Sequence, residues 1–331
     1  EMISKKIRIK ININDYLIYV VLATVCDVMP LRKLNRLISI IAFKEFSIKK
    51  NYAFEMLYHL NNKKNKISIN DLGYLIGPIL NAGGRLGKSN YATELLSSND
   101  NTTIKKFSIE LNELNLKRQK IETRILNHID FDKIEKDNKD VIVYYDNTIN
   151  EGLIGIIAAR LKDYFNKPAI VATYSNGILK CSARSVYNYN IGVVIKKSLD
   201  KNIILGGGGH NMAAGFTLKK NKLPLFENFI LNDFLKHGPS LNKSFKYDAE
   251  ISSIAFNKIF FDEIKKIEPF GTGNPIPIFL IKEVKVIKST VLNEKHISVI
   301  LKSKVGYSIN SISFNSVDSK IGDYLLHYKK K

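Results

Sequence analysis

The feature that most restricts the fold is a long amphipathic stretch at residues 101–128. Its apolar side chains recur at steps of three and four residues, a spacing that places them on one side of a helix. Arg118 occupies one step of this stripe, whose apolar members are Ile104, Phe107, Leu111, Leu114, Ile121 and Ile125. The spacing predicts one continuous helix, which either packs on a single domain or connects two.

The chain differs in character on the two sides of this stretch. Residues 1–100 predict mostly helices, near 16–25, 33–48, 52–61 and 70–80. Within residues 129–238, strands are expected at 141–145, 169–173 and 178–183, with helices at 152–163 and 224–236. Strand, helix and strand in short succession indicate an α/β domain, which Gly206–Gly209 interrupts. Gly238 and Pro239 mark a linker after it.

Residues 245–331 predict a third unit that is rich in β-structure. A short helix near 256–267 precedes strand-like stretches at 277–288, 296–302 and 308–314. Several short strands suggest a small barrel, for which the OB-fold is the nucleic-acid-binding candidate, and the chain is expected to stop before such a barrel closes. The predicted fold is therefore a multidomain α/β protein: a helical part (1–100), a connector helix (101–128), an α/β domain (129–238) and an OB-like domain (245–331).

The charge balance points to a polyanionic partner. The 331 residues carry 51 Lys and Arg against 31 Asp and Glu, a net charge of +20. Nucleic acid is the simplest partner for such a surplus, although an abundance of Lys, Asn and Ile from an AT-rich genome explains it equally well. Cys26 and Cys181 have no metal-ligand spacing, which predicts a reducing cytoplasm. No apolar run approaches the roughly 18 residues that span a bilayer, so no membrane association is expected.

The most specific motif is the glycine run that ends in His210. Backbone amides of Gly207, Gly208 and Gly209 can approach an anion without side-chain obstruction, and His210 adds a donor. Ala-Ala-Gly at 213–215 leaves room beside them. We interpret the motif as a phosphate site; the alternative is a flexible glycine turn with a structural histidine.

Two arginines stand in patterns that suit a phosphate. Strand alternation places Ser182 and Arg184 on one face, where a hydroxyl and a planar guanidinium fork can hold phosphate oxygens; an exposed strand edge is the alternative. Arg85 follows a glycine turn in Asn-Ala-Gly-Gly-Arg-Leu at 81–86. It is interpreted as a phosphate clamp or as an exposed residue at a helix C-cap. The glycines of 150–160 permit close helix–strand packing and a helix N-terminus that faces an anion.

Asp27 lies in an otherwise apolar stretch, Ala-Thr-Val-Cys-Asp-Val-Met-Pro-Leu at 23–31. A carboxylate in apolar surroundings is unfavourable unless it is paired, hydrogen-bonded or bound to a metal. The residue is therefore a candidate metal ligand, and the alternative is a carboxylate that caps a helix end.

Together these segments resemble the RecJ family of the DHH phosphoesterase superfamily. Residues 23–31 resemble its last metal-binding aspartate motif, and 81–86 its Asn-Ala-Gly-Arg-Leu turn. Residues 151–160, 182–185 and 207–215 resemble its DHH-associated domain. Glu-Pro-Phe-Gly-Thr-Gly-Asn-Pro at 268–275 is similar to the segment that leads into its OB-fold. The resemblance spans about residues 15–316.

The resemblance implies a single-stranded-DNA-specific 5′-to-3′ exonuclease of DNA repair and recombination, with two Mn²⁺ or Mg²⁺ ions. Asp27 is then a metal ligand and, with His210, a catalytic residue, while Arg85, Ser182, Arg184 and Gly207–His210 bind substrate phosphates. Single-stranded DNA, a single-strand-binding protein and a helicase are the implied partners. Two alternatives stay open: a non-catalytic single-strand-binding fragment, and a DHH-type oligonucleotide or cyclic-dinucleotide phosphodiesterase, against which 268–275 and the β-rich unit argue.

The sequence departs from the family at the metal site. The Asp-His-His triplet of the family is absent, and its earlier Asp-x-Asp motif is expected before residue 1. Asp130-Phe131-Asp132 is an Asp-x-Asp pattern, but it lies at the end of the connector helix, whereas the family motif precedes the other metal-binding motifs. We interpret this pair as a surface turn. Because one carboxylate cannot assemble two metals, we expect this chain to need an upstream part for catalysis.

Overall fold

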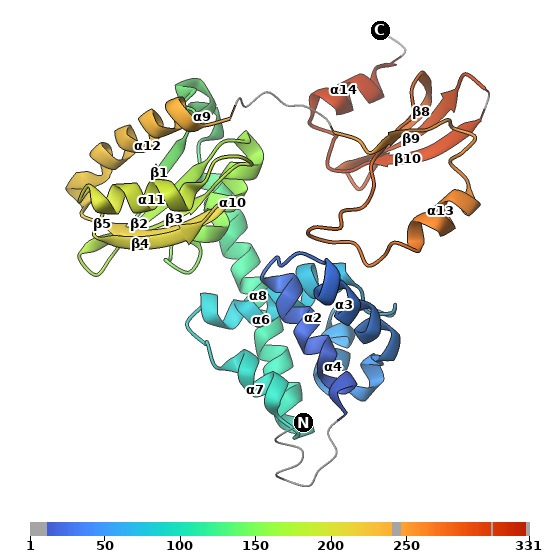
Figure 1. Cartoon of the computed structure of the whole chain (residues 1–331), viewed down its shortest axis with the longest axis horizontal. Coiled ribbons are helices and arrows are strands. Elements are labelled where there is room, and N and C mark those ends of the chain that lie inside the picture. Colours follow the sequence, from blue (N-terminus) through green and yellow to red (C-terminus); the bar gives the residue numbers. More distant parts are fainter. Residues whose placement is uncertain (1–11, 240–245, 306, 329–331) are drawn as a thin grey trace. The chain divides into compact units, whose positions relative to one another are not determined.

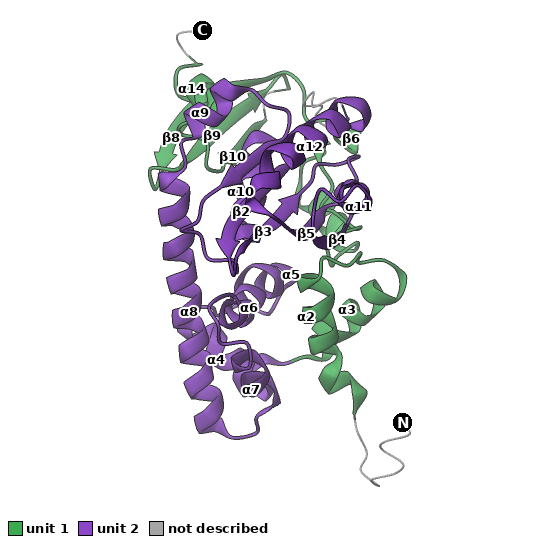
Figure 2. Cartoon of the chain, turned by 90° about the vertical axis from the view of Figure 1, so that its left-hand side faces the viewer, with its two compact units in different colours: residues 1–46, 244–331 green, residues 47–243 purple. Residues whose placement is uncertain are grey.

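The computed structural model describes residues 12–239, 246–305 and 307–328 (Figure 1). Two compact units make up the chain: residues 1–46 together with 244–331, and residues 47–243 (Figure 2). Each unit has its own secondary structure and is described by itself. The division into domains at 100, 128 and 238 remains a proposal from the sequence.

The second unit begins with helices that pack around one long helix. That helix, α8, spans Asn101–His128, and Asp100 caps it by accepting hydrogen bonds from the amides of Thr102 and Thr103. The helix predicted at 101–128 is therefore confirmed. Along α8 pack α4, α6, α7 and α10. The preceding elements are η2 (Ile48–Lys50), α4 (Tyr52–Leu60), α5 (Ile69–Asp71), the π-helical turn η3 (Leu72–Ile76), α6 (Gly77–Arg85) and α7 (Tyr91–Ser97).

A mixed five-stranded sheet with helices on both faces follows α8. Its strand order is β1-β2-β3-β5-β4, with β1 and β2 parallel and the other pairs antiparallel. One face packs on α10 and the other on α11 and α12. The predicted α/β architecture is thus confirmed. The elements are α9 (Phe131–Asp137), β1 (Ile142–Tyr145), α10 (Ile154–Phe165), β2 (Ala169–Ser175), β3 (Ile178–Arg184), α11 (Ile191–Asp200), β4 (Gly206–His210), β5 (Ala213–Leu218), η4 (Lys220–Lys222) and α12 (Leu223–His237).

The glycine run does not interrupt the α/β pattern, contrary to expectation. It forms the edge strand β4, paired with β5, rather than a loop or turn. A Cβ at Gly207 would lie 2.4 Å from the Cβ of Phe216, and one at Gly209 would lie 2.5 Å from the Cβ of Ala214. The absence of side chains at 207 and 209 therefore lets β4 approach β5. A Cβ at Gly208 would meet nothing within 4 Å, so its face of the strand is open.

The segment at Asp130–Asp132 is also different from the prediction. Asp130 is the N-cap of α9 and accepts a hydrogen bond from the amide of Lys133, so the segment starts a helix and is not a surface turn. An aspartate side chain that satisfies a free helix amide explains this position without a metal.

The first unit contains a small antiparallel sheet in the order β10-β9-β8 and a separate parallel pair, β6 with β7. The β-rich character predicted for residues 245–331 is confirmed by these strands. Its elements are η1 (Ile13–Tyr16), α2 (Leu17–Cys26), α3 (Lys33–Glu45), β6 (Ala249–Glu250), α13 (Lys258–Lys265), β7 (Phe279–Leu280), β8 (Val284–Leu292), β9 (His296–Ser303), β10 (Ser308–Ser313) and α14 (Lys320–Leu326).

Within this unit the turn at 268–275 is hydrogen-bonded to the segment that follows Asp27. The Leu31 amide donates to the Thr272 carbonyl at 2.6 Å, and the Arg32 Nε donates to the Gly273 carbonyl at 2.7 Å. Arg36 donates to the carbonyl oxygens of Ile267 and Glu268. The two sequence motifs, about 240 residues apart, therefore form one structural element.

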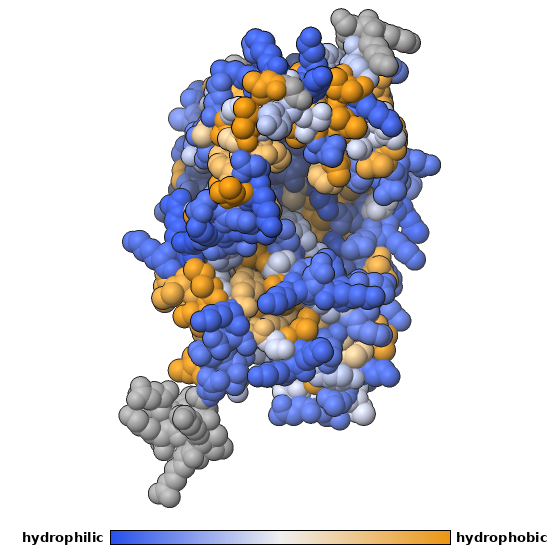
Figure 3. All heavy atoms as spheres, turned by 90° about the vertical axis from the view of Figure 1, so that its right-hand side faces the viewer, coloured by the Kyte–Doolittle hydropathy of each residue, from blue (hydrophilic) through white to orange (hydrophobic). Residues whose placement is uncertain are grey.

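Hydrophilic side chains gather over much of the face shown in Figure 3, with apolar side chains between them. Among the described residues, no helix combines the length and the apolar character needed to cross a membrane.

The stability of the second unit depends on the buried side of α8. We expect Leu111→Ala, at a fully buried position, to lower the free energy of unfolding by about 2–5 kcal/mol, since truncation leaves a cavity. Leu116→Ala on the same helix is the matched control: Leu116 is 49% exposed, so a change within about 0.5 kcal/mol is expected. Urea unfolding followed by circular dichroism compares them, and equal losses would contradict this packing of α8.

Candidate phosphate-binding site

The register of three strands places the predicted site residues on one face of the sheet. Arg184 of β3 pairs with Ala213 of β5, which pairs with His210 of β4. Ser182 pairs with Gly215, which pairs with Gly208, two residues along each strand. Paired residues and alternate residues share a face. These two rows of paired residues lie about 7 Å apart along the strands, and neighbouring strands lie about 5 Å apart. Arg184, Ser182, Gly208 and His210 therefore surround a patch that is about 7 Å by 10 Å.

The start of α10 packs directly over the β3 part of this face. A Cβ at Gly155 would lie 3.0 Å from the Arg184 Nη2 and 3.2 Å from the Ser182 Oγ. The close helix–strand packing predicted for the glycines of 150–160 is confirmed here. The Arg184 Nη1 donates to the Ser182 Oγ at 3.1 Å and to the Ala183 carbonyl at 2.9 Å, which fixes the direction of the guanidinium.

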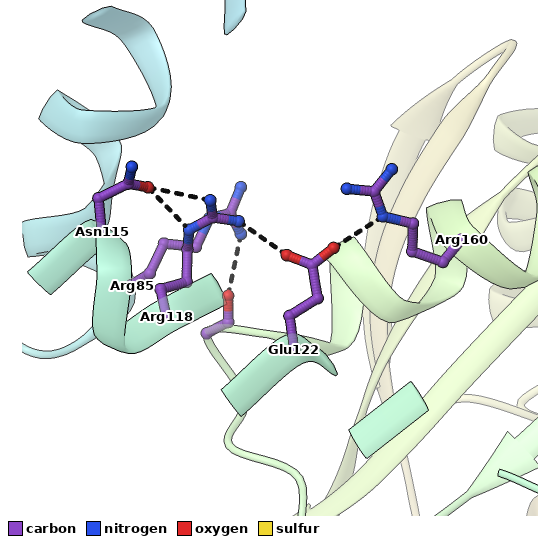
Figure 4. A network of polar contacts seen from close by, with 6 residues as sticks. Arg85, Asn115, Arg118, Glu122 and Arg160 are labelled. Carbon is purple, nitrogen blue, oxygen red and sulfur yellow. Dashed lines mark hydrogen bonds and ion pairs between the residues drawn. The ribbon is translucent and has the colours of Figure 1, made fainter. Parts of the chain in front are cut away.

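Arg85 reaches the same region from the end of α6. Its Nη1 donates to the Gly152 carbonyl at 3.0 Å (Figure 4). A Cβ at Gly152 would lie 2.4 Å from the Arg85 carbonyl oxygen, so glycine permits the contact. Two expectations are corrected. Gly83 and Gly84 lie inside α6 rather than in a turn, and Arg85 is half-buried rather than an exposed cap residue.

The charges of this region repel one another. Burial, and then the positive charge of Arg118, lower the pKa of Arg85. Burial, and then the charge of Arg85, lower the pKa of Arg184. Both guanidiniums nevertheless stay protonated, because arginine does not lose its proton in proteins at neutral pH. Among the described residues, neither forms an ion pair with a carboxylate. We call Arg85, Ser182 and Arg184 the clamp.

A buried carboxylate forms ion pairs with two neighbouring arginines but not with the clamp. Glu122 is 8% exposed and accepts from the Arg118 Nη1 at 2.9 Å and from the Arg160 Nε at 2.7 Å (Figure 4). Asn115 accepts from the other side of Arg118. Each guanidinium nitrogen of Arg118, the polar member of the α8 stripe, thus donates a hydrogen bond. This network was not predicted, although a charged residue at an apolar step of the stripe was its signal in the sequence.

His210 presents one ring nitrogen to the open side. Its Nδ1 accepts from the Met212 amide at 3.3 Å, so the neutral ring carries its proton on Nε2. The residue is exposed, as are Gly207, Gly208 and Gly209. A depression of about 560 Å³ lies beside this strand, lined by Glu151, Gly152, Lys180, Gly206, Gly215 and Thr217.

Asp27 lies in the other unit, at the C-cap of α2, where it is exposed. It is not surrounded by apolar side chains, and its own amide donates to the Ala23 carbonyl at 2.9 Å. Within the described ranges, no three His, Cys, Asp or Glu side chains come close enough to hold a metal ion. The described residues alone therefore do not form the two-metal site that the family resemblance implies.

Comparisons with known proteins identify the family of the chain. Residues 138–236 match the DHHA1 domain and residues 247–327 the RecJ OB domain. The single-stranded-DNA-specific exonuclease RecJ of Haemophilus influenzae is 30% identical over 320 residues, covering 92% of this chain and 55% of that protein. RecJ of Bacillus subtilis is 27% identical over 317 residues, covering 91% and 39%. The chain is a relative of RecJ.

Solved RecJ structures share the fold. RecJ from Thermus thermophilus in complex with Mg²⁺ matches with a TM-score of 0.79 and 22% identity, covering 95% of this chain and 48% of that chain. The complex with Mn²⁺ matches with a TM-score of 0.78, covering 93% and 45%. The chain thus spans about half the length of the RecJ proteins that it matches.

The clamp geometry predicts an effect of a methyl group at Gly155. Gly155→Ala should displace the Arg184 guanidinium by a few tenths of an ångström, because the added Cβ would lie 3.0 Å from its Nη2. We expect pyrophosphate to bind about fivefold more weakly, on the order of 1 kcal/mol, as one charged hydrogen bond loses its alignment.

Gly84→Ala is the matched control, since its Cβ would meet nothing within 4 Å in another helix. Isothermal titration calorimetry should show unchanged affinity for this variant. Equal affinities for wild type and Gly155→Ala would contradict the role of Gly155 in seating Arg184.

Proposed function

We propose that the chain serves a RecJ-type, single-stranded-DNA-specific 5′-to-3′ exonuclease and supplies the part that holds the DNA. Its substrate is a single strand whose phosphate lies in the clamp, facing His210 and the open side of β4. Contacts with a single-strand-binding protein and a helicase, and a cytoplasmic location, remain predictions from the family resemblance.

The observation that carries this proposal is the pair of uncompensated guanidiniums. Arg85 and Arg184 are half-buried, repel each other and have no carboxylate partner among the described residues. Gathering like charges in a partly dehydrated place is unfavourable unless an anion offsets it. Two planar forks and a hydroxyl match the oxygens of a phosphate, and DNA supplies a phosphate at every nucleotide.

The remaining parts of the chain favour a strand over a small anion. Residues 247–327 match an OB domain, a fold that binds single strands through a basic groove and stacking. The net charge of +20 supports the same kind of partner. A dinucleotide phosphodiesterase has no need of this second binding module.

The clamp is tested by Arg184→Ala. We expect affinity for 5′-phosphorylated single-stranded DNA to fall roughly 10- to 100-fold, about 1.5–3 kcal/mol, because a charged hydrogen bond to phosphate is lost. Fluorescence anisotropy over a salt series measures this. Lys236→Ala, at an exposed position of α12, is the control and should bind within about twofold of wild type. Affinity that is unchanged in Arg184→Ala at every salt concentration, with the fold intact, would exclude the clamp.

The assignment of Asp27 to the metal rather than to the clamp is tested in parallel. When the chain is combined with the upstream metal-binding part that it is expected to need, Asp27→Asn should remove manganese-dependent degradation of 5′-phosphorylated single strands. It should leave binding without metal within about twofold, as a carboxylate cannot donate to phosphate. Degradation that persists in Asp27→Asn would overturn its role as a metal ligand. Comparing turnover of long strands with that of dinucleotides separates the nuclease from a small phosphodiesterase.

A further inference from the structure

A second basic surface lies beside the clamp. Part of it is formed by α8, on the side next to the one that carries Asn115, Arg118 and Glu122. A groove of about 1090 Å³ runs between α8, the turn after α6 and the loop that joins β1 to α10. Arg85 and Gly152 are among the residues that line it, so the groove adjoins the clamp. We propose that this groove holds the nucleotides adjoining the clamped phosphate, with the sugar–phosphate backbone along α8. This inference rests on the proposed function.

The α8 wall of the groove combines cations with an apolar floor. Its six residues recur at helical spacing: Leu114, Lys117, Ile121, Arg124, Ile125 and His128. At 100° per residue they cover one side of the helix, next to the side that carries Asn115, Arg118 and Glu122. Lys117 and Arg124 are exposed and nearly two turns apart, about 10 Å, which is long enough to meet successive phosphates of a strand. The aliphatic side chains between them suit sugars and base faces.

The opposite wall has the contrary character. It comes from the loop after β1 and contains Asp146, Thr148, Asn150 and Glu151. Carboxylates repel phosphates but accept hydrogen bonds from the amino groups of bases. The Asp146 carboxylate is held in place by the amide and hydroxyl of Thr148, at 2.8 and 2.7 Å. The two walls therefore orient a strand: phosphates toward α8 and base edges toward the loop.

The size of the groove fits a short run of nucleotides rather than a lone anion. Small-molecule pockets have volumes of about 300–1,000 Å³, and this groove of about 1090 Å³ is slightly larger. One phosphate would leave most of it unfilled. Lys88 adds a further cation on the side of Arg85, which continues the positive path from the clamp.

The inference is tested by reversing charge on the α8 wall. The double variant Lys117→Glu/Arg124→Glu should bind a 12-nucleotide oligothymidylate at least tenfold more weakly than wild type at low salt. The slope of the logarithm of the binding constant against the logarithm of the salt concentration should become shallower by about 1.4, since two phosphate contacts are lost. Binding of 5′-phosphorylated dithymidylate, which the clamp holds, should change by less than threefold.

The matched control is Lys105→Glu/Lys236→Glu, which makes the same change in net charge at exposed positions outside the groove. It should weaken binding of both oligonucleotides to a similar, smaller extent. A long-strand affinity for the groove variant equal to that of this control would overturn the groove while leaving the clamp intact. If wild type binds neither oligonucleotide, the proposed function itself fails, so the two failures are distinguishable.

Discussion

The basic site depends on two close approaches at glycines, and the one at Gly152 leaves no room for a Cβ. At Gly152 the loop before α10 comes within 2.4 Å of the Arg85 carbonyl oxygen, measured from an ideal Cβ, and at Gly155 the helix lies against Arg184 and Ser182. These contacts bring a residue from the end of α6 and two residues of β3 to one place. A side chain at 152 would separate the helical part of the unit from the sheet part, because the carbonyl that it meets belongs to rigid backbone.

Bringing the arginines together is unfavourable because their charges repel one another. An ion pair offsets this repulsion for Arg118 and Arg160, but not for the clamp. Glu122 forms ion pairs with Arg118 and Arg160 on the side of α8 that faces α10, and the Asn115 Oδ1 accepts from the Nε and Nη2 of Arg118. Arg85 instead donates to a carbonyl and Arg184 to a hydroxyl and a carbonyl, which hold direction without removing charge. A phosphate would relieve the repulsion that burial and neighbouring charge create. In the proposed function the clamp is therefore preorganised, since these hydrogen bonds already orient its side chains.

Sequence reasoning located this site where local patterns determined the geometry. Alternation along a strand correctly placed Ser182 and Arg184 on one face, and the three-and-four spacing correctly gave α8. It misjudged the glycine run, because glycine has little preference for strands and the reason for its presence at 207 and 209 is the neighbouring β5. It also missed the Glu122 network, since the partners come from α8 and α10, more than 35 residues apart. The apolar stretch around Asp27 suggested a buried carboxylate, with a helix-end carboxylate as the alternative. Asp27 lies at the end of α2 and is exposed, as are Val28 and Met29.

The motifs at 23–31 and 268–275 were found in the sequence separately, and only the structure shows that they lie together. Separately, one is a carboxylate at a helix end and the other a turn before a β-rich domain. In the structure, hydrogen bonds from Leu31, Arg32 and Arg36 join them. A Cβ at Gly273 would lie 2.9 Å from the Cβ of Pro30, and its φ of 77° lies in the left-handed region, so glycine is required twice over at this position. The turn therefore constrains the backbone that carries Asp27, which gives the OB-like part of this unit a physical connection to the aspartate motif.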